Sequence, residues 1–300
     1  MDMTQNKCCR HGASLRRRRR RRRKILRSII FSCSIIAVAV FVAVGSRMIT
    51  SGDGGTNRYD VEAGNNTYDN AVIENSKISE NNKIQNEQSM LDDIMNSTQY
   101  PKQLQELALK NEEALEFVYD YPAEHVKEHT IDLTEEASMD SVPLFVQWDK
   151  RWGYEKYSGN FFAASGCGPT TLSMVVVYLT HNRDASPIAV AKYSKEAGYS
   201  VDGSGSSWTL ISEGCRHYGV KAKTVALDES RMKAELDEGH PIVVNVGPGD
   251  FTDTGHFMVI TGYDDEGFSI NDPNSIEKSG KRWLFKNISS QIRAVWSMYV

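Results

Sequence analysis

The chain has 300 residues, of which 40% are hydrophobic and 25% are charged, the composition of a globular protein with one or two domains. Its net charge of −4 divides into +11 for residues 1–27, which contain twelve Lys or Arg and one acid, and −15 for the remainder. An acidic body argues against nucleic-acid binding by residues 28–300. Only two of the five cysteines, Cys167 and Cys215, follow residue 46, which excludes a disulfide framework. Because the sequence has no clustered Cys/His pattern, we expect neither a metal site nor a cofactor.

Residues 28–46 contain no charged side chain and predict a transmembrane helix. Nineteen residues at about 1.5 Å each come close to the ~30 Å of a bilayer core. Eight consecutive arginines and Lys24 precede them directly, and positive charge stays on the cytoplasmic side. We therefore expect a signal anchor, with a basic tail (1–27) in the cytoplasm and the rest of the chain outside. The alternative is a cleaved signal peptide ending near Ala43-Val44-Gly45, which would leave a secreted protein.

Residues 47–98 are rich in Asn, Ser, Gly and acidic side chains, and we interpret them as a flexible stalk, with a short helix over 78–94 as an alternative for part of it. Residues 99–140 form a predicted helical lead-in and connector. Its apolar residues follow helical spacing from Pro101 until Tyr121-Pro122 ends the pattern. These residues are Leu104, Leu107, Leu115 and Val118.

Residues 141–300 have the pattern of an α+β domain. Helices are predicted from Cys167, from about Ser207 and over 229–238. Strands are predicted over 220–226, 241–246, 256–261 and 268–271. Helices gathered first, followed by a mostly antiparallel sheet, are typical of this fold class.

Cys167 lies in the segment Ser165-Gly166-Cys167-Gly168-Pro169, where a helix is predicted to begin at the cysteine. Pro169 suits a first turn, because its missing N–H would have no partner there. The unpaired N–H groups and the dipole of a helix start stabilise a thiolate. We therefore interpret Cys167 as a nucleophile, the alternative being a buried structural cysteine. The flanking Gly166 and Gly168 would leave room for a substrate backbone.

His256 opens an apolar strand, and Asp272 closes the next strand sixteen residues later. An antiparallel return brings Asp272 to about the level of His256, although the sequence does not determine the register to one residue. A histidine beside a thiol can act as a base, and a carboxylate can orient it. The simpler alternatives are a buried histidine without chemical function and a carboxylate that caps the turn before Pro273.

Four motifs together carry a family resemblance. They are Gln147-Trp148-Asp149, Gly166-Cys167-Gly168-Pro169-Thr170, Gly255-His256-Phe257 and Asn271-Asp272-Pro273. With them, residues 141–300 resemble the bacteriocin-processing (double-glycine-leader) cysteine peptidases, and more closely their stand-alone relatives in cell-envelope proteins of Gram-positive bacteria. The resemblance implies a papain-like fold, with Cys167 as nucleophile, His256 as general base and acid, and Asp272 as the orienter of His256. It also implies that Gln147 and the backbone N–H of Cys167 form the oxyanion hole.

These features predict a membrane-anchored, extracytoplasmic cysteine peptidase or amidase that works through a thioester acyl-enzyme. The partner would be a peptide, an envelope protein or a peptidoglycan stem peptide. An acyl transferase would use the same residues, with an amine in place of water resolving the thioester. A catalytically silent module that binds a peptide or partner is the alternative from another class. A disulfide between Cys167 and Cys215 would instead make the domain structural or redox-controlled.

Overall fold

The computed structural model describes the backbone of residues 66–300 and the side chains of residues 79–300. The expected basic tail, the expected membrane span and residues 47–65 of the expected stalk lie outside this range. Among the helices of the described part of the chain, none combines the length and the apolar composition needed to cross a bilayer. The transmembrane helix at 28–46 therefore stays a prediction.

Residues Asn66–Asn96 form one α-helix, α2, where we had expected a flexible stalk with at most a short helix. The segment contains neither Gly nor Pro, so no residue within it interrupts the helix. Its side chains are mostly exposed from residue 79 to residue 93. Ile94 is fully buried, and Met90 and Leu91 pack against the same cluster of apolar residues. The end of α2 is thus held by packing against the lead-in.

The lead-in consists of short helices. They are α3 (Lys102–Lys110), η1 (Glu112–Ala114), α4 (Leu115–Tyr119), α5 (Tyr121–Glu124) and α6 (Thr134–Ala137). The four apolar residues that predicted a helix here are all buried. The pattern is broken at Asn111, whose backbone is extended and whose side chain accepts a hydrogen bond from the N–H of Glu113. The buried residues pack with Phe161 and Ala163, which lie just before Cys167 in the chain.

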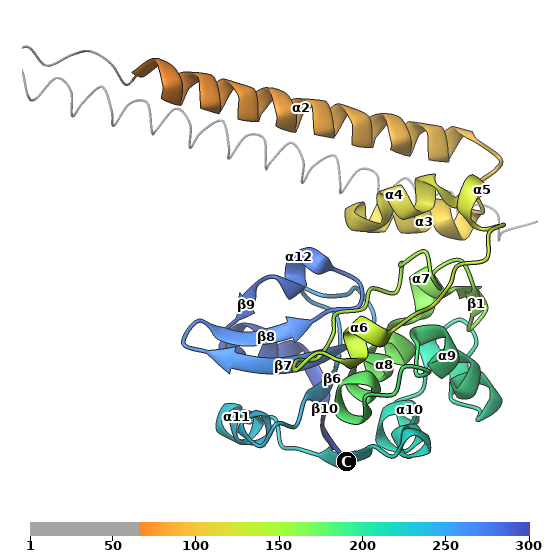
Figure 1. The fold of residues 1–300 in the computed structure, drawn as a ribbon, viewed down its shortest axis with the longest axis vertical. Helices are drawn as coiled ribbons and strands as arrows, with labels where there is room; N and C mark the ends of the chain where they lie inside the picture. Colours follow the sequence, from red (N-terminus) through yellow and green to blue (C-terminus); the bar gives the residue numbers. More distant parts are fainter. Residues whose placement is uncertain (1–65) are drawn as a thin grey trace, which may run out of the picture. The chain divides into compact units, whose positions relative to one another are not determined.

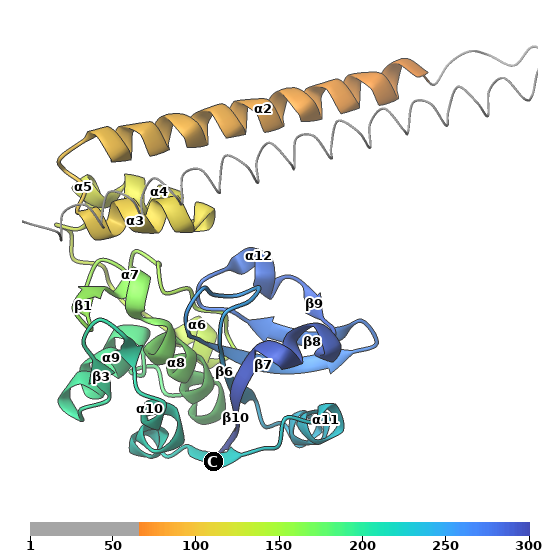
Figure 2. The same ribbon diagram turned by 180° about the vertical axis from the view of Figure 1, so that it is seen from behind.

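A six-stranded sheet lies within residues 141–300, and all its neighbouring strands are antiparallel. The strand order is β5-β10-β6-β7-β8-β9, so the last strand lies between two earlier ones. The strands are β5 (Lys221–Thr224), β6 (Ile242–Val246), β7 (His256–Asp264), β8 (Gly267–Asn271), β9 (Arg282–Trp283) and β10 (Ile292–Tyr299). Figures 1 and 2 show this sheet beside the helices α8 to α10.

Helix α8 (Cys167–Thr180) covers one face of the sheet and is buried along most of its length. Alternate residues of a strand point to opposite faces. On β7, Phe257 and Val259 accordingly join the core cluster that contains α8, whereas Met258 and Ile260 join the cluster on the other face. That second cluster includes Met232 of α11 (Glu229–Asp237). The sheet therefore separates two apolar cores.

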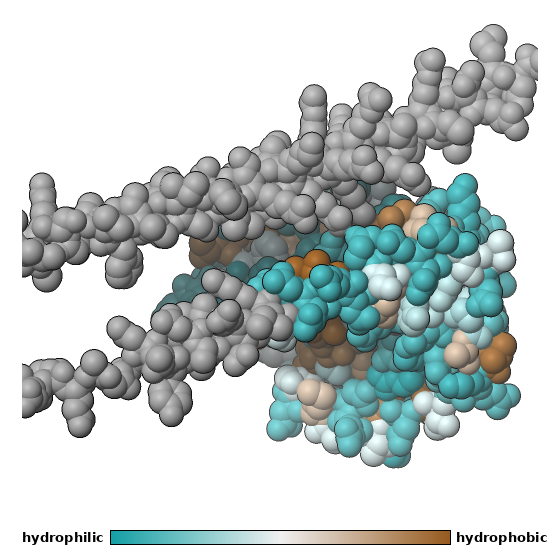
Figure 3. Space-filling model, turned by 90° about the horizontal axis from the view of Figure 1, so that it is seen from above, coloured by the Kyte–Doolittle hydropathy of each residue, from teal (hydrophilic) through white to brown (hydrophobic). Residues whose placement is uncertain are grey.

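The remaining elements of residues 141–300 are short hairpins and helices. The hairpins are β1 (Lys156–Tyr157) with β2 (Asn160–Phe161) and β3 (Ser200–Val201) with β4 (Gly205–Ser206). The helices are α7 (Phe162–Ser165), α9 (Pro187–Glu196), α10 (Thr209–Ser212), η2 (Gly214–Tyr218), α12 (Ile276–Ser279), α13 (Phe285–Ile288) and η3 (Ser289–Gln291). The face of the molecule seen in Figure 3 is mostly hydrophilic, as expected for a chain with buried apolar cores.

The α+β class and the mostly antiparallel sheet expected from the sequence are confirmed. The predicted strands and the helix over 229–238 occur with bounds shifted by up to three residues. The helix predicted from about Ser207 is instead a turn of α-helix, α10, followed by the 3-10 helix η2. Our sequence prediction included neither β10 nor α9.

Candidate active site

Cys167 is the first residue of α8, where the sequence predicted a helix start. The thiol is free, and the residue is partly exposed. Burial by itself raises the pKa of this thiol. The hydrogen bond and charge of His256 and the backbone N–H groups of Phe257 and Gly168 outweigh burial and lower the pKa below its ordinary value. The structure thus favours a thiolate at this position.

The two glycines beside Cys167 are required by close packing. A Cβ on Gly168 would lie 2.5 Å from Ser206 Oγ and 2.7 Å from Ser206 Cβ. A Cβ on Gly166 would lie 2.6 Å from the ring of Phe162. We had expected these glycines to leave room for a substrate backbone. In the structure, the space beside them is taken by Ser206 and Phe162 of the protein itself.

His256 and Asp272 are both buried, and His256 Nε2 lies 2.6 Å from Asp272 Oδ1. Because Nε2 contacts the carboxylate, Nδ1 is the ring nitrogen left for the hydrogen bond with Cys167. Burial alone would lower the pKa of His256. The charge and hydrogen bond of Asp272, with a further contribution from Cys167, overcome burial and raise the pKa to about 10. The two shifts together favour a thiolate–imidazolium pair at neutral pH.

The β7–β8 hairpin determines which face of the sheet Asp272 occupies. Val259 pairs with Asn271, and in this register the next residue, Asp272, lies level with Met258. The register shifts by one position between Ile260 and Gly262. Without that shift Asp272 would lie level with Val259, on the opposite face from His256, because a one-residue slip reverses the faces of a strand. The irregularity in β7 is therefore what brings His256 and Asp272 to the same face.

Gln147 is buried between two segments of the site. Its Nε2 donates to the carbonyl of Ala163 at 2.8 Å, four residues before Cys167. Its backbone N–H donates to the carbonyl of Pro273 at 2.7 Å, directly after Asp272. An amide nitrogen has two hydrogens, so one remains after the bond to Ala163. The Gln147 side chain thus keeps one N–H beyond its bond to Ala163, and its role as an oxyanion donor stays a prediction.

Cys215 differs from Cys167 in its burial and in the direction in which its pKa is shifted. It lies in η2, is fully buried, and burial raises the pKa of its thiol to about 11. Both cysteines are free, so the hypothesis of a Cys167–Cys215 disulfide is wrong. Cys215 is an inert core residue.

Sequence reasoning missed several groups at the site because they are backbone atoms. The N–H groups of Gly168 and Phe257 help to lower the pKa of the Cys167 thiol. The N–H of Asn274 donates to Asp272 Oδ1 at 2.8 Å. Every residue except proline has such a group, so no residue type in the sequence signals it.

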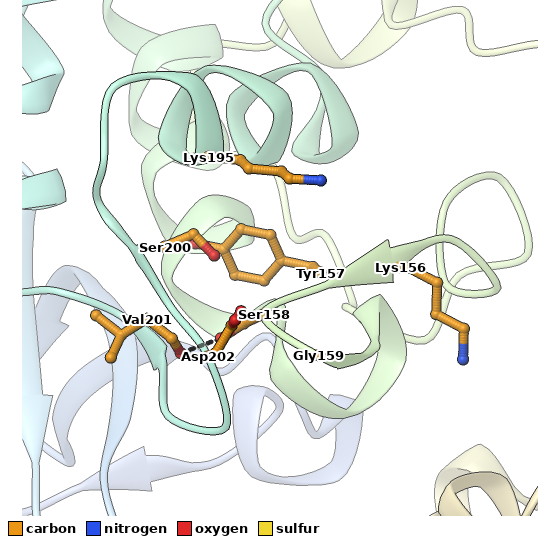
Figure 4. A pocket seen from close by; sticks show the side chains of 8 residues that line it. All are labelled: Lys156, Tyr157, Ser158, Gly159, Lys195, Ser200, Val201 and Asp202. Carbon is orange, nitrogen blue, oxygen red and sulfur yellow. Dashed lines mark hydrogen bonds between the residues drawn. The ribbon is translucent and has the colours of Figure 1, made fainter.

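A cavity of about 420 Å³ lies beside the segment that precedes Cys167 (Figure 4). Tyr157 joins the cavity to Ser165, two residues before Cys167, because its carbonyl accepts a hydrogen bond from Ser165 Oγ at 2.8 Å, and its hydroxyl lies 2.6 Å from Ser206 Oγ. The cavity contains none of the four predicted site residues, and its charged side chains are of both signs. It is lined by Lys156, Tyr157, Ser158, Gly159, Lys195, Ser200, Val201 and Asp202.

Glu235, Glu238 and His240 form a group that could hold a metal ion, with ligand atoms within 4.8 Å of one another. Lys223 Nζ already lies 2.8 Å from Glu235 Oε1. The hydrogen bond from Lys223, with one from Ser297, lowers the pKa of Glu235 to about 2. An ammonium at this carboxylate opposes the approach of a metal cation. We assign no metal to this group.

Comparisons with known proteins place the site in context. A sequence model of the Peptidase_C39 like family matches residues 139–300, more than half of the chain. The peptidase domain of Streptococcus ComA, a bi-functional ABC transporter involved in a quorum sensing pathway, is 18% identical, with 53% of this chain and 96% of that chain covered and a TM-score of 0.39. A C39-like peptidase from Bacillus anthracis is 16% identical, with 53% and 95% covered and a TM-score of 0.34. A comparison with curated proteins found no match.

Proposed function

This chain belongs to the Peptidase_C39 like family, and on that premise we propose that it is a cysteine peptidase or amidase that cleaves a peptide bond through a thioester. The observation that carries the proposal is that His256 lies 2.6 Å from buried Asp272 and lowers the pKa of the partly exposed Cys167 thiol. Thiol catalysis uses a nucleophile, a base close to it and a third group that orients the base. The opposite pKa shifts of Cys167 and Cys215 support the assignment of Cys167 alone.

In acylation, the Cys167 thiolate attacks the carbonyl carbon of the scissile bond, and the carbonyl electron pair moves to oxygen. The oxyanion accepts hydrogen bonds from the Gln147 amide and from the first-turn N–H of Cys167. Both donors act on charge that is largest in the transition state, so they lower the barrier. His256 then gives its Nδ1 proton to the leaving amine, the C–N bond breaks, and a thioester remains.

In deacylation, neutral His256 accepts a proton from water as the water oxygen attacks the thioester. The C–S bond breaks, and the thiolate–imidazolium pair is restored. Asp272 holds Nε2 throughout, so Nδ1 stays directed at the sulfur and the imidazolium is stabilised. An amine in place of water would give acyl transfer by the same steps.

The proposed location is the outer face of the cytoplasmic membrane, with residues 28–46 as the anchor. The charge-free span and the preceding arginines support this orientation. The substrate would then be a peptide, an envelope protein or a peptidoglycan stem peptide. Protease added to intact protoplasts should degrade residues 66–300 and leave the basic tail intact. A body that stays protected while an external control protein is degraded would contradict this location.

The catalytic proposal is tested with p-nitrophenyl acetate, an activated ester that acylates thiolates without requiring the natural substrate. The full-length protein in detergent should release a burst of p-nitrophenol and carry an acetyl group on Cys167, detected by mass spectrometry. Cys167→Ala should abolish the burst, whereas Cys215→Ser, the matched control, should retain it. A wild-type burst no larger than that of Cys167→Ala would refute the enzyme and leave the peptide-binding module.

A further inference from the structure

The position of the Asp272 carboxylate depends on residues 272–279, which we call the Asp272 loop. Asp272 Oδ1 accepts the N–H of Asn274 at 2.8 Å in addition to its contact with His256. The Asp272 backbone N–H donates to Ser279 Oγ at 2.9 Å, and its carbonyl accepts the N–H of Ser275 at 3.1 Å. A displacement of this loop would therefore move the carboxylate relative to His256.

Asn111 of the lead-in fastens the middle of the Asp272 loop. Its Nδ2 donates to the carbonyl of Asn274 at 2.9 Å and lies 3.1 Å from Asn274 Oδ1. Its Oδ1 accepts the N–H of Glu113 at 3.0 Å and so caps η1. One side chain thus breaks the lead-in helix and holds the residue whose N–H contacts Asp272.

Glu113 binds the same loop at residues 275–277. Its Oε2 accepts the N–H groups of Ile276 at 2.7 Å and Glu277 at 3.1 Å, and its Oε1 accepts the hydroxyl of Ser275. These N–H groups open the short helix α12 and have no partner within it. Hydrogen bonds to a carboxylate are stronger than those between neutral groups. The lead-in therefore supplies a charged cap more than 160 residues away in sequence.

We propose that Asn111 and Glu113 are positioning residues of the active site, which hold the Asp272 loop so that Asp272 stays in contact with His256. The inference rests on the proposed function of Cys167 and His256. Both residues lie before the family match at 139–300, so the lead-in is part of the catalytic unit and is more than a spacer between membrane and domain. A misplacement of about 1 Å in a catalytic group can lower the rate about 10²-fold. The loss of either contact should therefore lower the reaction rate measurably.

Two variants of the full-length protein remove these contacts with little change in shape. Asn111→Asp keeps the oxygen that caps η1 and replaces the donor to Asn274 by an acceptor. Glu113→Gln keeps the side-chain size and removes the charge and one acceptor oxygen. Glu106→Gln, at an exposed position of α3, removes the same charge from the same segment and is the matched control.

We expect Asn111→Asp and Glu113→Gln to slow acylation by p-nitrophenyl acetate about tenfold to a hundredfold. The pH at which Cys167 becomes reactive should also move toward alkaline values, because His256 loses part of its stabilisation by Asp272 and the thiolate loses its cation. Glu106→Gln should leave both the rate and the pH profile unchanged. Circular dichroism and thermal unfolding identify a variant that has lost its fold, and the other variant then carries the test.

A coupling experiment separates positioning from general support of the fold. If Asn111 and Glu113 act through Asp272, their variants should have no further effect in an Asp272→Ala background. The inference would be overturned if the variants lowered the acylation rate by the same factor in both backgrounds, or if both folded variants kept the wild-type pH profile. Either result would leave wild-type acylation at Cys167 intact. A wild-type protein that does not acylate at Cys167 would refute the proposed function and this inference with it, so the two failures are distinguishable.

Discussion

Replacement of His256 by Ala should change Cys167 from a thiolate at neutral pH into a poorly ionised thiol. In the wild type, burial raises the pKa of Cys167, but the hydrogen bond and charge of His256, together with two backbone N–H groups, outweigh burial. Without the imidazole ring, only two backbone N–H groups oppose the increase in the Cys167 pKa that burial causes. Burial raises the pKa of Cys215 in the same domain to about 11. We therefore expect the pKa of Cys167 to rise from below its ordinary value to above it.

The expected change in the alkylation rate of Cys167 follows from two opposing consequences of a higher thiol pKa. Each unit by which a thiol pKa rises above the assay pH lowers the thiolate fraction about tenfold, while the remaining thiolate becomes about threefold more nucleophilic. The alkylation rate should therefore fall about threefold per unit, and about tenfold for a rise of two units. The wild type should react faster at acidic pH, and the order should reverse in strongly alkaline buffer, where both thiols are ionised and the thiolate of higher pKa is the better nucleophile.

The assay is the rate of iodoacetamide modification of the Cys167 peptide as a function of pH, followed by mass spectrometry. The Cys215 peptide is an internal control, since that thiol is fully buried and should stay unmodified while the protein is folded. In the same pH series, wild-type turnover should rise as Cys167 ionises and fall near pH 10. The fall is expected because His256, with its pKa raised to about 10, then loses the proton that it gives to the leaving amine. Identical alkylation profiles for wild type and His256→Ala would refute the ion pair.

Three further predictions concern the surroundings of the pair. Gln147→Ala should lower turnover about 10²–10³-fold in a folded protein, the cost of one oxyanion donor, and an unchanged rate would show that Gln147 only joins the two segments it contacts. Asp272→Ala should reduce turnover more than Asp272→Asn, because the amide can keep a hydrogen bond to the ring although not the charge; wild-type rates in both would limit Asp272 to capping the turn. Gly168→Ala should destabilise the fold by about 1–3 kcal/mol in chemical denaturation, since its Cβ would lie 2.5 Å from Ser206 Oγ. Ser206→Gly in the same chain should recover most of that loss, and an additive loss would show that the strain lies elsewhere.

The sequence alone determined the features that depend on neighbouring residues. A glycine–cysteine–glycine–proline segment before an apolar run predicted that a helix begins at Cys167, and α8 begins there. Alternating and apolar runs predicted β6, β7 and β8, and a turn composition predicted the hairpin between the last two. These elements follow from backbone preferences and from the period of the apolar residues, which act over a few residues. The positions of Cys167, His256 and Asp272 at the ends of such elements made them candidates before any contact was known.

Only the tertiary structure decided what depends on residues far apart in the chain. The last strand, β10, pairs between β5 and β6, and no local pattern specifies which strands it joins. The one-residue shift in β7 decides that Asp272 shares a face with His256, and the alternation of apolar residues predicts the strand without its register. Asn111 and Glu113 look like an ordinary cap and an ordinary surface acid in sequence, and they reach the Asp272 loop only because the chain folds back after more than 160 residues. Local physics specifies the elements, whereas burial and hydrogen bonding between distant segments select how these elements meet.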